Sequence, residues 1–204
     1  GKRGDGWLVR NVGALAYGRE RGIAMQGDFS LNVANPLTAA YFMGQGLEGL
    51  TVSYDLSGEQ VLSLAAKVPG SWFEVTLHQH MPMFHMEHCV YAAFLSDGTD
   101  YTNCGRPCET HRVALRDRVG MAHPLRADVG CRNTLFNASA QSGAEFFEAF
   151  YRAGLHTFRI ELLEENAAET RRVIEVYQGL LSGNLTGRDV WKALKAKSQL
   201  GVTR

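Results

Sequence analysis

Four cysteines are the side chains of this sequence whose type and spacing best suit chemistry. They follow the spacing C-x14-C-x3-C-x22-C and are Cys89, Cys104, Cys108 and Cys131. Thiolate sulfurs bind zinc tetrahedrally or hold the corners of an iron–sulfur cluster. Gly105 and Pro107 predict a turn that would present both sulfurs of the C-x3-C pair to one metal. The spacing therefore indicates one shared site. Four unrelated buried thiols are the alternative, because cysteine often packs as a small apolar residue.

Histidines crowd the segment before the first of these cysteines. Four of them lie between residues 78 and 88. Neutral imidazole is the commonest metal ligand, and it is also an acid and base near neutral pH. We therefore expect His85 and His88, the two nearest to Cys89, to act as metal ligands or as catalytic groups. A Cys–His dyad is a further reading, but a catalytic thiolate would compete with metal ligation by the same sulfur.

Two carboxylates are candidates for catalysis. Glu161 lies near the end of a predicted strand, 157–162, and Asp128 lies shortly before Cys131. Active sites of parallel β/α folds gather at the carboxyl ends of the strands. A strand in such a fold would therefore direct Glu161 toward the site. A salt bridge to Arg159 is the alternative role of Glu161.

Residues for substrate binding are predicted in two places. Asp28 and Asn32 lie at the end of the predicted strand 23–31, where they would bind substrate or cap the following helix. From residue 104 to residue 132, six arginines stand against three acids. A basic segment of this kind suits an anionic partner such as RNA, and a solvated loop face is the alternative. The arginines expected to bind substrate are Arg106, Arg112 and Arg132.

These residues would be positioned by alternating strands and helices. The expected strands are 6–12, 23–31, 50–54, 72–78 and 157–162, and the expected helices are 37–43, 57–67, 144–152 and 166–181. Ser57 with Gln60 predicts a capping box for the second of these helices. The alternation predicts an α/β fold with a parallel sheet. We expect a partial or modified (β/α) TIM-type barrel, because about five strands fall short of a complete barrel's eight.

A long segment interrupts this alternation. Residues 79–141 hold all four cysteines and a predicted hairpin of 111–117 and 122–128. We expect them to form a Cys/His-rich insert within a barrel portion that spans residues 1–183. Residues 184–204 are predicted to be a helical or disordered tail. A barrel with too few strands leaves a sheet edge open, which favours a homodimer or a partner subunit.

Composition narrows the class of protein. The 204 residues carry 21 basic and 21 acidic side chains, and 45% are apolar. Balanced charge gives no support for wholesale binding to nucleic acid or membranes. No apolar run reaches the roughly 18 residues that span a bilayer, and no signal peptide is visible. We therefore expect a cytoplasmic protein without a membrane partner, in which cysteines serve as ligands rather than disulfides.

The order of four sequence runs resembles the collagenase-like peptidase family U32. The runs are FHMEHCVYAAFLSDG, NCGRPCETHRVALRD, ADVGCRNTLFNA and FRIELLEE. They carry, in turn, the first cysteine, the C-x3-C pair, Asp128 with the last cysteine, and Ile160-Glu161. The likeness is to the C-terminal part of the family's barrel domain, and it covers nearly the whole chain. Met86-Glu87-His88 before Cys89, and Leu162 after Glu161, depart from the family's usual residues.

Three functions follow from the resemblance and from the cysteines. A collagenase-like peptidase would hydrolyse peptides, although neither a G-x-S-x-G nor an H-E-x-x-H motif occurs here. Other members of the family use a four-cysteine [4Fe–4S] cluster in oxygen-independent hydroxylation of RNA bases or of a quinone precursor, as the enzyme or an accessory protein. A non-catalytic, metal-stabilised interaction domain is the third. The expected cofactor is a [4Fe–4S] cluster or zinc, and the expected substrate is a peptide or RNA.

Overall fold

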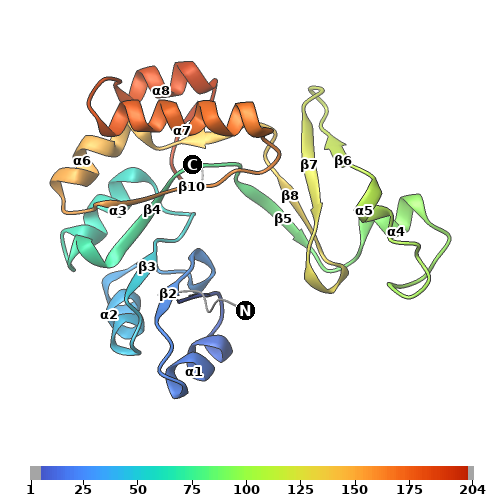
Figure 1. Ribbon diagram of the computed structural model, residues 1–204, viewed down its shortest axis with the longest axis horizontal. Coiled ribbons are helices and arrows are strands. Elements are labelled where there is room, and N and C mark those ends of the chain that lie inside the picture. The colour runs from blue at the N-terminus through green and yellow to red at the C-terminus, as the bar shows by residue number, and fades with distance from the viewer. Residues whose placement is uncertain (1–5, 202–204) are drawn as a thin grey trace. The chain divides into compact units, whose positions relative to one another are not determined.

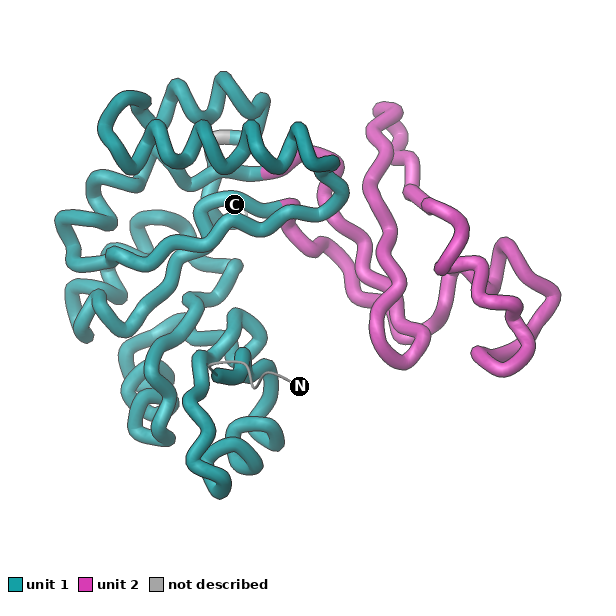
Figure 2. The backbone as a smooth tube through the Cα atoms, in the orientation of Figure 1, with its two compact units in different colours: residues 1–79, 141–204 teal, residues 80–140 magenta. Residues whose placement is uncertain are grey.

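The computed structural model describes residues 6–201. The chain divides into two compact units (Figure 2). Unit 1 combines the residues up to Gln79 with those from Gln141 onward, and unit 2 is His80–Ala140. Within the described residues, no helix is both long enough and apolar enough to cross a membrane.

Unit 1 is built on a sheet of seven described strands. Its parallel strands are β1 (Trp7–Val9), β2 (Met25–Gly27), β3 (Gly49–Thr51), β4 (Phe73–Gln79) and β10 (Thr157–Ile160). They pair in the order β1-β2-β3-β4, and β10 also pairs with β4. The sheet continues through β9 (Gln141–Ser142), antiparallel to β4, and β11 (Lys197–Ser198), parallel to β9. Because the long strands are parallel, the residues that follow them gather at one edge of the sheet.

Helices follow the outer side of these strands (Figure 1). They are α1 (Val12–Glu20), α2 (Pro36–Gly44), α3 (Gly58–Ala65), α6 (Phe147–Arg152), α7 (Ala167–Leu181) and α8 (Gly187–Leu194), with short 3-10 turns at η1 (Phe29–Leu31), η2 (Gly70–Trp72) and η4 (Ala144–Phe146). The capping box predicted for Ser57 and Gln60 is present at the start of α3. Asn166 and Glu169 form another at the start of α7. These side chains satisfy backbone N–H groups that a helix start leaves free.

The side chains of β4 show how the sheet divides its residues between two faces. Phe73 and Leu77 are buried in the main hydrophobic core. Successive side chains of a strand point to opposite faces, so Glu74 and Thr76, which lie between core residues of β4, belong to the other face. Apolar residues therefore pack one face against the helices, and the opposite face carries polar groups.

Unit 2 is an antiparallel sheet in the order β5-β8-β7-β6, with short helical segments. Its elements are β5 (Pro82–Met86), α4 (Val90–Leu95), α5 (Pro107–Thr110), β6 (Val113–Arg116), β7 (Ala122–Ala127), η3 (Val129–Cys131) and β8 (Asn133–Phe136). Tyr91, Leu125 and Leu135 form a small buried core, and Cys89 and Cys108 pack against it. The cysteines thus lie beside the apolar centre of a small unit.

The predicted α/β class is confirmed, and β6 and β7 pair as the predicted hairpin. The described strands do not close into a barrel, because the order of pairing begins at β1 and ends at β11 without joining them. The strand expected over 6–12 ends at Val9, since Asn11 accepts the N–H of Ala14 at 2.8 Å and starts helix α1. In the expected tail, 187–194 form α8, and 202–204 lie outside the described residues.

Candidate functional site

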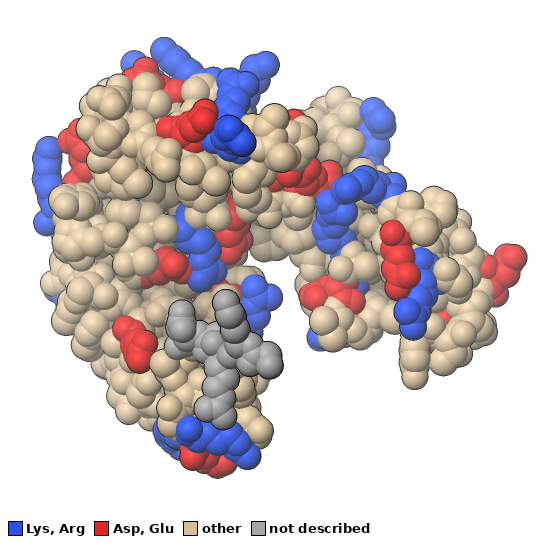
Figure 3. Space-filling view, viewed as in Figure 1, with Lys and Arg blue, Asp and Glu red and all other residues tan. Residues whose placement is uncertain are grey.

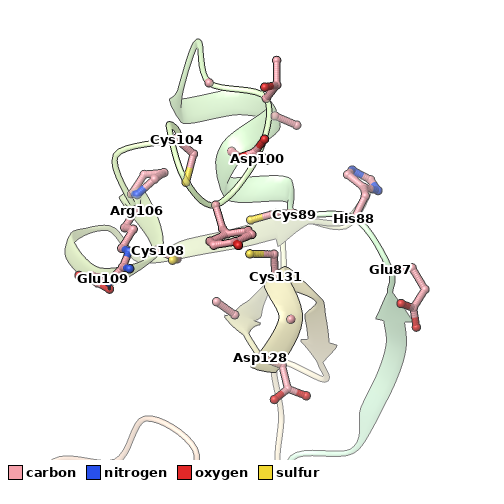
Figure 4. A pocket seen from close by; sticks show the side chains of 18 residues that line it. Glu87, His88, Cys89, Asp100, Cys104, Arg106, Cys108, Glu109, Asp128 and Cys131 are labelled. Carbon is pink, nitrogen blue, oxygen red and sulfur yellow. Dashed lines mark hydrogen bonds and ion pairs between the residues drawn. The ribbon is translucent and has the colours of Figure 1, made fainter.

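A cavity of about 890 Å³ in unit 2 is lined by all four cysteines. Cys89 precedes α4, Cys104 lies in the loop before α5, Cys108 is in α5 and Cys131 ends η3. Figure 4 shows the four sulfurs around a common space, with those of Cys89 and Cys131 pointing into it in the same direction. Three separate stretches of chain therefore bring four thiols to one cavity.

The loop that carries Cys104 depends on glycine. A Cβ atom on Gly98 would lie 2.5 Å from the Cα of Cys104, so a larger residue would force this loop apart. After the cysteine, Gly105 and Arg106 have φ values of +67° and +50°. Two successive left-handed residues turn the chain sharply, and Pro107 then begins α5. The turn predicted between the two cysteines of the C-x3-C pair is thus formed by these residues.

The thiols of this cavity influence one another electrostatically. Burial raises the pKa of Cys108, and negative charge on Cys89 and Cys104 raises it further. All four cysteines are free thiols. A bound cation would offset the repulsion between thiolates and favour their charged form. The donor set therefore fits a soft metal ion or an iron–sulfur cluster.

The side chains do not form a finished ligand set. Among residues 6–201, no group of three or more His, Cys, Asp or Glu side chains is placed to hold a metal ion. The sulfurs share one cavity but remain apart. Ligation would require the cysteine side chains to turn closer together.

The histidines predicted as ligands or catalytic groups are directed elsewhere. His88 lines the cavity, but its ring points away from the sulfurs in Figure 4. His85 is not part of the lining. Its Nδ1 shares a hydrogen bond of 3.0 Å with the hydroxyl of Thr134 on the adjacent strand β8. The structure therefore assembles no dyad of Cys89 with either histidine.

Asp128 and Arg106 line the cavity, but both have partners outside the set of cysteines. The carboxylate of Asp128 points away from the sulfurs in Figure 4 and accepts the N–H of Val129 at 2.7 Å. Arg106 forms an exposed ion pair of 3.3 Å with Glu109. The other two predicted arginines, Arg112 and Arg132, are not part of the lining. Of the predicted basic set, only Arg106 reaches this cavity.

A second polar group lies at the strand ends of unit 1, around Arg159. The Nη1 atom of Arg159 is 2.7 Å from Asp28 and 3.2 Å from Glu161, and its Nη2 atom is 2.5 Å from Glu74. Asp28 is fully buried and also accepts Nε of Arg10 at 2.7 Å. The salt bridge considered for Glu161 is therefore present. Asp28 makes ion pairs instead of a capping bond to η1.

Tyr54 completes this group, and no sequence pattern indicated its role. Its O–H donates to Oε1 of Glu161, and burial, followed by this hydrogen bond, raises the pKa of Tyr54. Burial lowers the pKa of Arg159, but the hydrogen bond to Asp28 and the charges of Glu74 and Asp28 raise it above its usual value. The charged guanidinium of Arg159 and the neutral phenol of Tyr54 therefore both lie beside the carboxylate of Glu161.

Asn32 and Glu74 also lie near this edge of the sheet, and only the first was predicted from the sequence. Asn32 accepts the hydroxyl of Ser53 at 2.8 Å, so it links the segments after β2 and β3. Glu74 is the only acidic residue of β4, whose sequence is FEVTLHQ. A carboxylate within an otherwise uncharged buried strand needs a partner, and this signal could have identified Glu74.

The fold and the cavity together define a mixed α/β protein with a compact cysteine-bearing insert. The model of peptidase family U32 matches residues 2–201, so the chain belongs to this family. Comparison with curated proteins and with solved structures gave no match.

Proposed function

We propose that this U32 family member is an enzyme that binds a soft metal ion or a [4Fe–4S] cluster through Cys89, Cys104, Cys108 and Cys131. The observation that carries the proposal is the single cavity lined by all four thiols. Burial, and then the negative charge of neighbouring thiolates, raise the pKa of Cys108, and a bound cation would favour the thiolate against both effects. A bound cluster would supply electron-transfer chemistry at this place, whereas zinc would supply structural stability or a Lewis acid.

Anaerobic purification followed by metal analysis and absorption spectroscopy tests this site. A brown protein with about four irons per chain supports the cluster, and a colourless zinc protein supports the alternative ion. The double variant Cys104→Ser/Cys108→Ser should lose the metal. His85→Ala should retain it, because His85 is bonded to Thr134 and does not line the cavity. A wild-type chain that takes up neither iron nor zinc on reconstitution contradicts the proposal.

Hydrolysis of peptides is the reaction that membership of the family supports. We infer that Glu161 is the carboxylate that acts on the substrate. Tyr54 and Arg159 both donate to its Oε1, which leaves Oε2 to accept a proton. Asp28 would act indirectly, by holding Arg159. Glu161→Gln should then abolish hydrolysis of gelatin or collagen-like peptides, and unchanged hydrolysis would exclude this role.

Cluster-dependent, oxygen-independent hydroxylation of RNA or of a quinone precursor is the second candidate function. One observation favours it: the four thiols line one cavity, and the ring of His88, which also lines that cavity, points away from the sulfurs. Peptide hydrolysis that survives Cys104→Ser/Cys108→Ser would show that the cysteines are not its catalytic centre. Loss of a hydroxylated base or quinone product in cells that carry the same variant would favour hydroxylation.

A non-catalytic, metal-stabilised module is the third candidate. The buried core of unit 2 contains only Tyr91, Leu125 and Leu135, and a small unit gains stability from a metal. Chelation should then raise amide hydrogen exchange within residues 80–140 while any activity of the chain persists. A homodimer or partner subunit belongs to the same proposal, and light scattering of the purified chain tests it.

A further inference from the structure

Asn133 is a fully buried polar residue beside the cysteine cavity, and it is not one of the residues to which the function proposed for this protein assigns a role. It begins β8 and has an exposed fraction of 0%. A buried amide is costly unless its donors and acceptor are satisfied. Its hydrogen bonds therefore show which parts of unit 2 it holds.

The bonds of Asn133 reach the chain directly after two of the cysteines. Its Oδ1 accepts the N–H of Val90 at 2.7 Å, one residue beyond Cys89. Its Nδ2 donates to the carbonyl of Arg132 at 2.6 Å, one residue beyond Cys131. The same Nδ2 lies 4.0 Å from Sγ of Cys89, at the long end of N–H···S contacts. One amide therefore connects the two loops that carry Cys89 and Cys131.

The loop of Cys131 needs such support. Gly130 and Cys131 have φ values of +76° and +60°. A left-handed conformation is unfavourable for a residue with a Cβ atom, and it persists only where surrounding contacts impose it. The bond from Asn133 fixes the carbonyl of Arg132, which immediately follows the strained residue.

We propose that Asn133 is a positioning residue of the four-cysteine site. It holds the backbone after Cys89 and Cys131 at a fixed separation, and it directs an N–H toward the sulfur of Cys89. This inference rests on the proposed metal or cluster site. Hydrogen bonds to ligating sulfurs tune a bound metal, and such outer contacts affect affinity about 10–100-fold.

The test uses Co²⁺ as the probe, added to the full chain under reducing, anaerobic conditions. Thiolate-to-cobalt charge transfer reports both affinity and ligation. Asn133→Ala should weaken Co²⁺ binding about 10–100-fold. Asn137→Ala is the matched control, because the side-chain oxygen of Asn137 accepts only the nearby N–H of Ser139 and Asn137 does not line the cavity. This control should bind as the wild type does.

A second variant separates the sulfur contact from folding. Asn133→Asp retains an acceptor for the N–H of Val90 but loses both donated bonds. It should fold, by far-UV circular dichroism, and shift the charge-transfer band to longer wavelength, since a thiolate without its N–H donor is easier to oxidise. If Asn133→Ala unfolds, this variant decides the question.

The outcomes distinguish the two proposals. A wild-type chain that binds no Co²⁺ and takes up no iron on reconstitution overturns the metal site itself. If the wild type binds Co²⁺ and either Asn133 variant matches it in both affinity and spectrum, only the positioning role of Asn133 is overturned.

Discussion

Arg159 of β10 and Glu74 of β4 form an ion pair of 2.5 Å between adjacent parallel strands. Both side chains are mostly buried, at 17% and 18% exposed. The same guanidinium binds Asp28 and Glu161. One arginine therefore contacts three carboxylates from different parts of unit 1, and Arg10 shares one of them, Asp28.

Removal of this arginine should destabilise unit 1 strongly. Arg159→Ala would leave Glu74 and the fully buried Asp28 without their shared partner. Breaking a buried ion pair by removing one member costs about 3–5 kcal/mol. Urea unfolding followed by circular dichroism measures the change. Arg152→Ala is a matched control, because Arg152 forms an exposed pair with Glu148 and such pairs contribute about 0–1 kcal/mol. Equal effects of the two variants would contradict the prediction.

The phenol of Tyr54 should remain neutral in alkaline solution as long as the chain is folded. Burial, followed by the hydrogen bond to Glu161, raises the pKa of Tyr54 above the ordinary tyrosine value of 10.0. A group whose pKa is raised by folding contributes its full stabilisation at pH values below its pKa in the unfolded chain. This contribution is lost as the pH rises through its pKa in the folded chain.

Ultraviolet titration at the tyrosinate band tests this expectation. Between about pH 9 and 11, where ordinary tyrosines titrate, Tyr54→Phe should leave the tyrosinate absorbance of the folded chain unchanged. After unfolding in urea, the same variant should absorb less than the unfolded wild type, because the phenol then titrates as an ordinary tyrosine. A clear drop with folded Tyr54→Phe in that range would refute the prediction.

The hairpin of unit 2 should lose stability in acid through Asp117. Burial raises the pKa of Asp117, but the N–H groups of Met121 and Val119 and the contact with His123 outweigh burial, and the pKa falls below 3.8. A group whose pKa is lowered by folding contributes its full stabilisation at pH values above its pKa in the unfolded chain. This contribution is lost as the pH falls through its pKa in the folded chain.

Asp117→Asn should therefore lower the thermal midpoint of unfolding at pH 7, and its difference from the wild type should shrink below pH 3.8. Scanning calorimetry from pH 7 to about pH 3, around the usual Asp value, measures both. A constant difference at every pH would count against the assignment.

Gly98 should be required for the cysteine site. A Cβ atom there would meet the Asn103 carbonyl and the Cα of Cys104 at 2.5 Å. Gly98→Ala should therefore displace the loop that carries Cys104 and weaken Co²⁺ binding. Gly44→Ala is the control, because nothing lies within 4 Å of a Cβ at Gly44. Unaltered Co²⁺ binding by Gly98→Ala would exclude this role of the loop.

Local features of the fold could be predicted from the sequence. The capping box of Ser57 and Gln60 and the hairpin of β6 and β7 both match expectation. Each depends on residues a few positions apart, so nearby side chains suffice to specify it. The end of β1 at Val9 could not be predicted in this way, because a strand preference and the cap at Asn11 compete within the same few residues.

The sequence by itself determined the α/β class, the family, and the confinement of all four cysteines to one segment. Only the tertiary structure decided which polar groups meet. It placed Arg159 between Asp28, Glu74 and Glu161, turned His88 away from the sulfurs, and set Asn133 between the loops of Cys89 and Cys131. These contacts depend on the path and pairing of distant strands. Types and spacing along the chain therefore indicate the available chemistry, whereas strand register decides which groups can carry it out together.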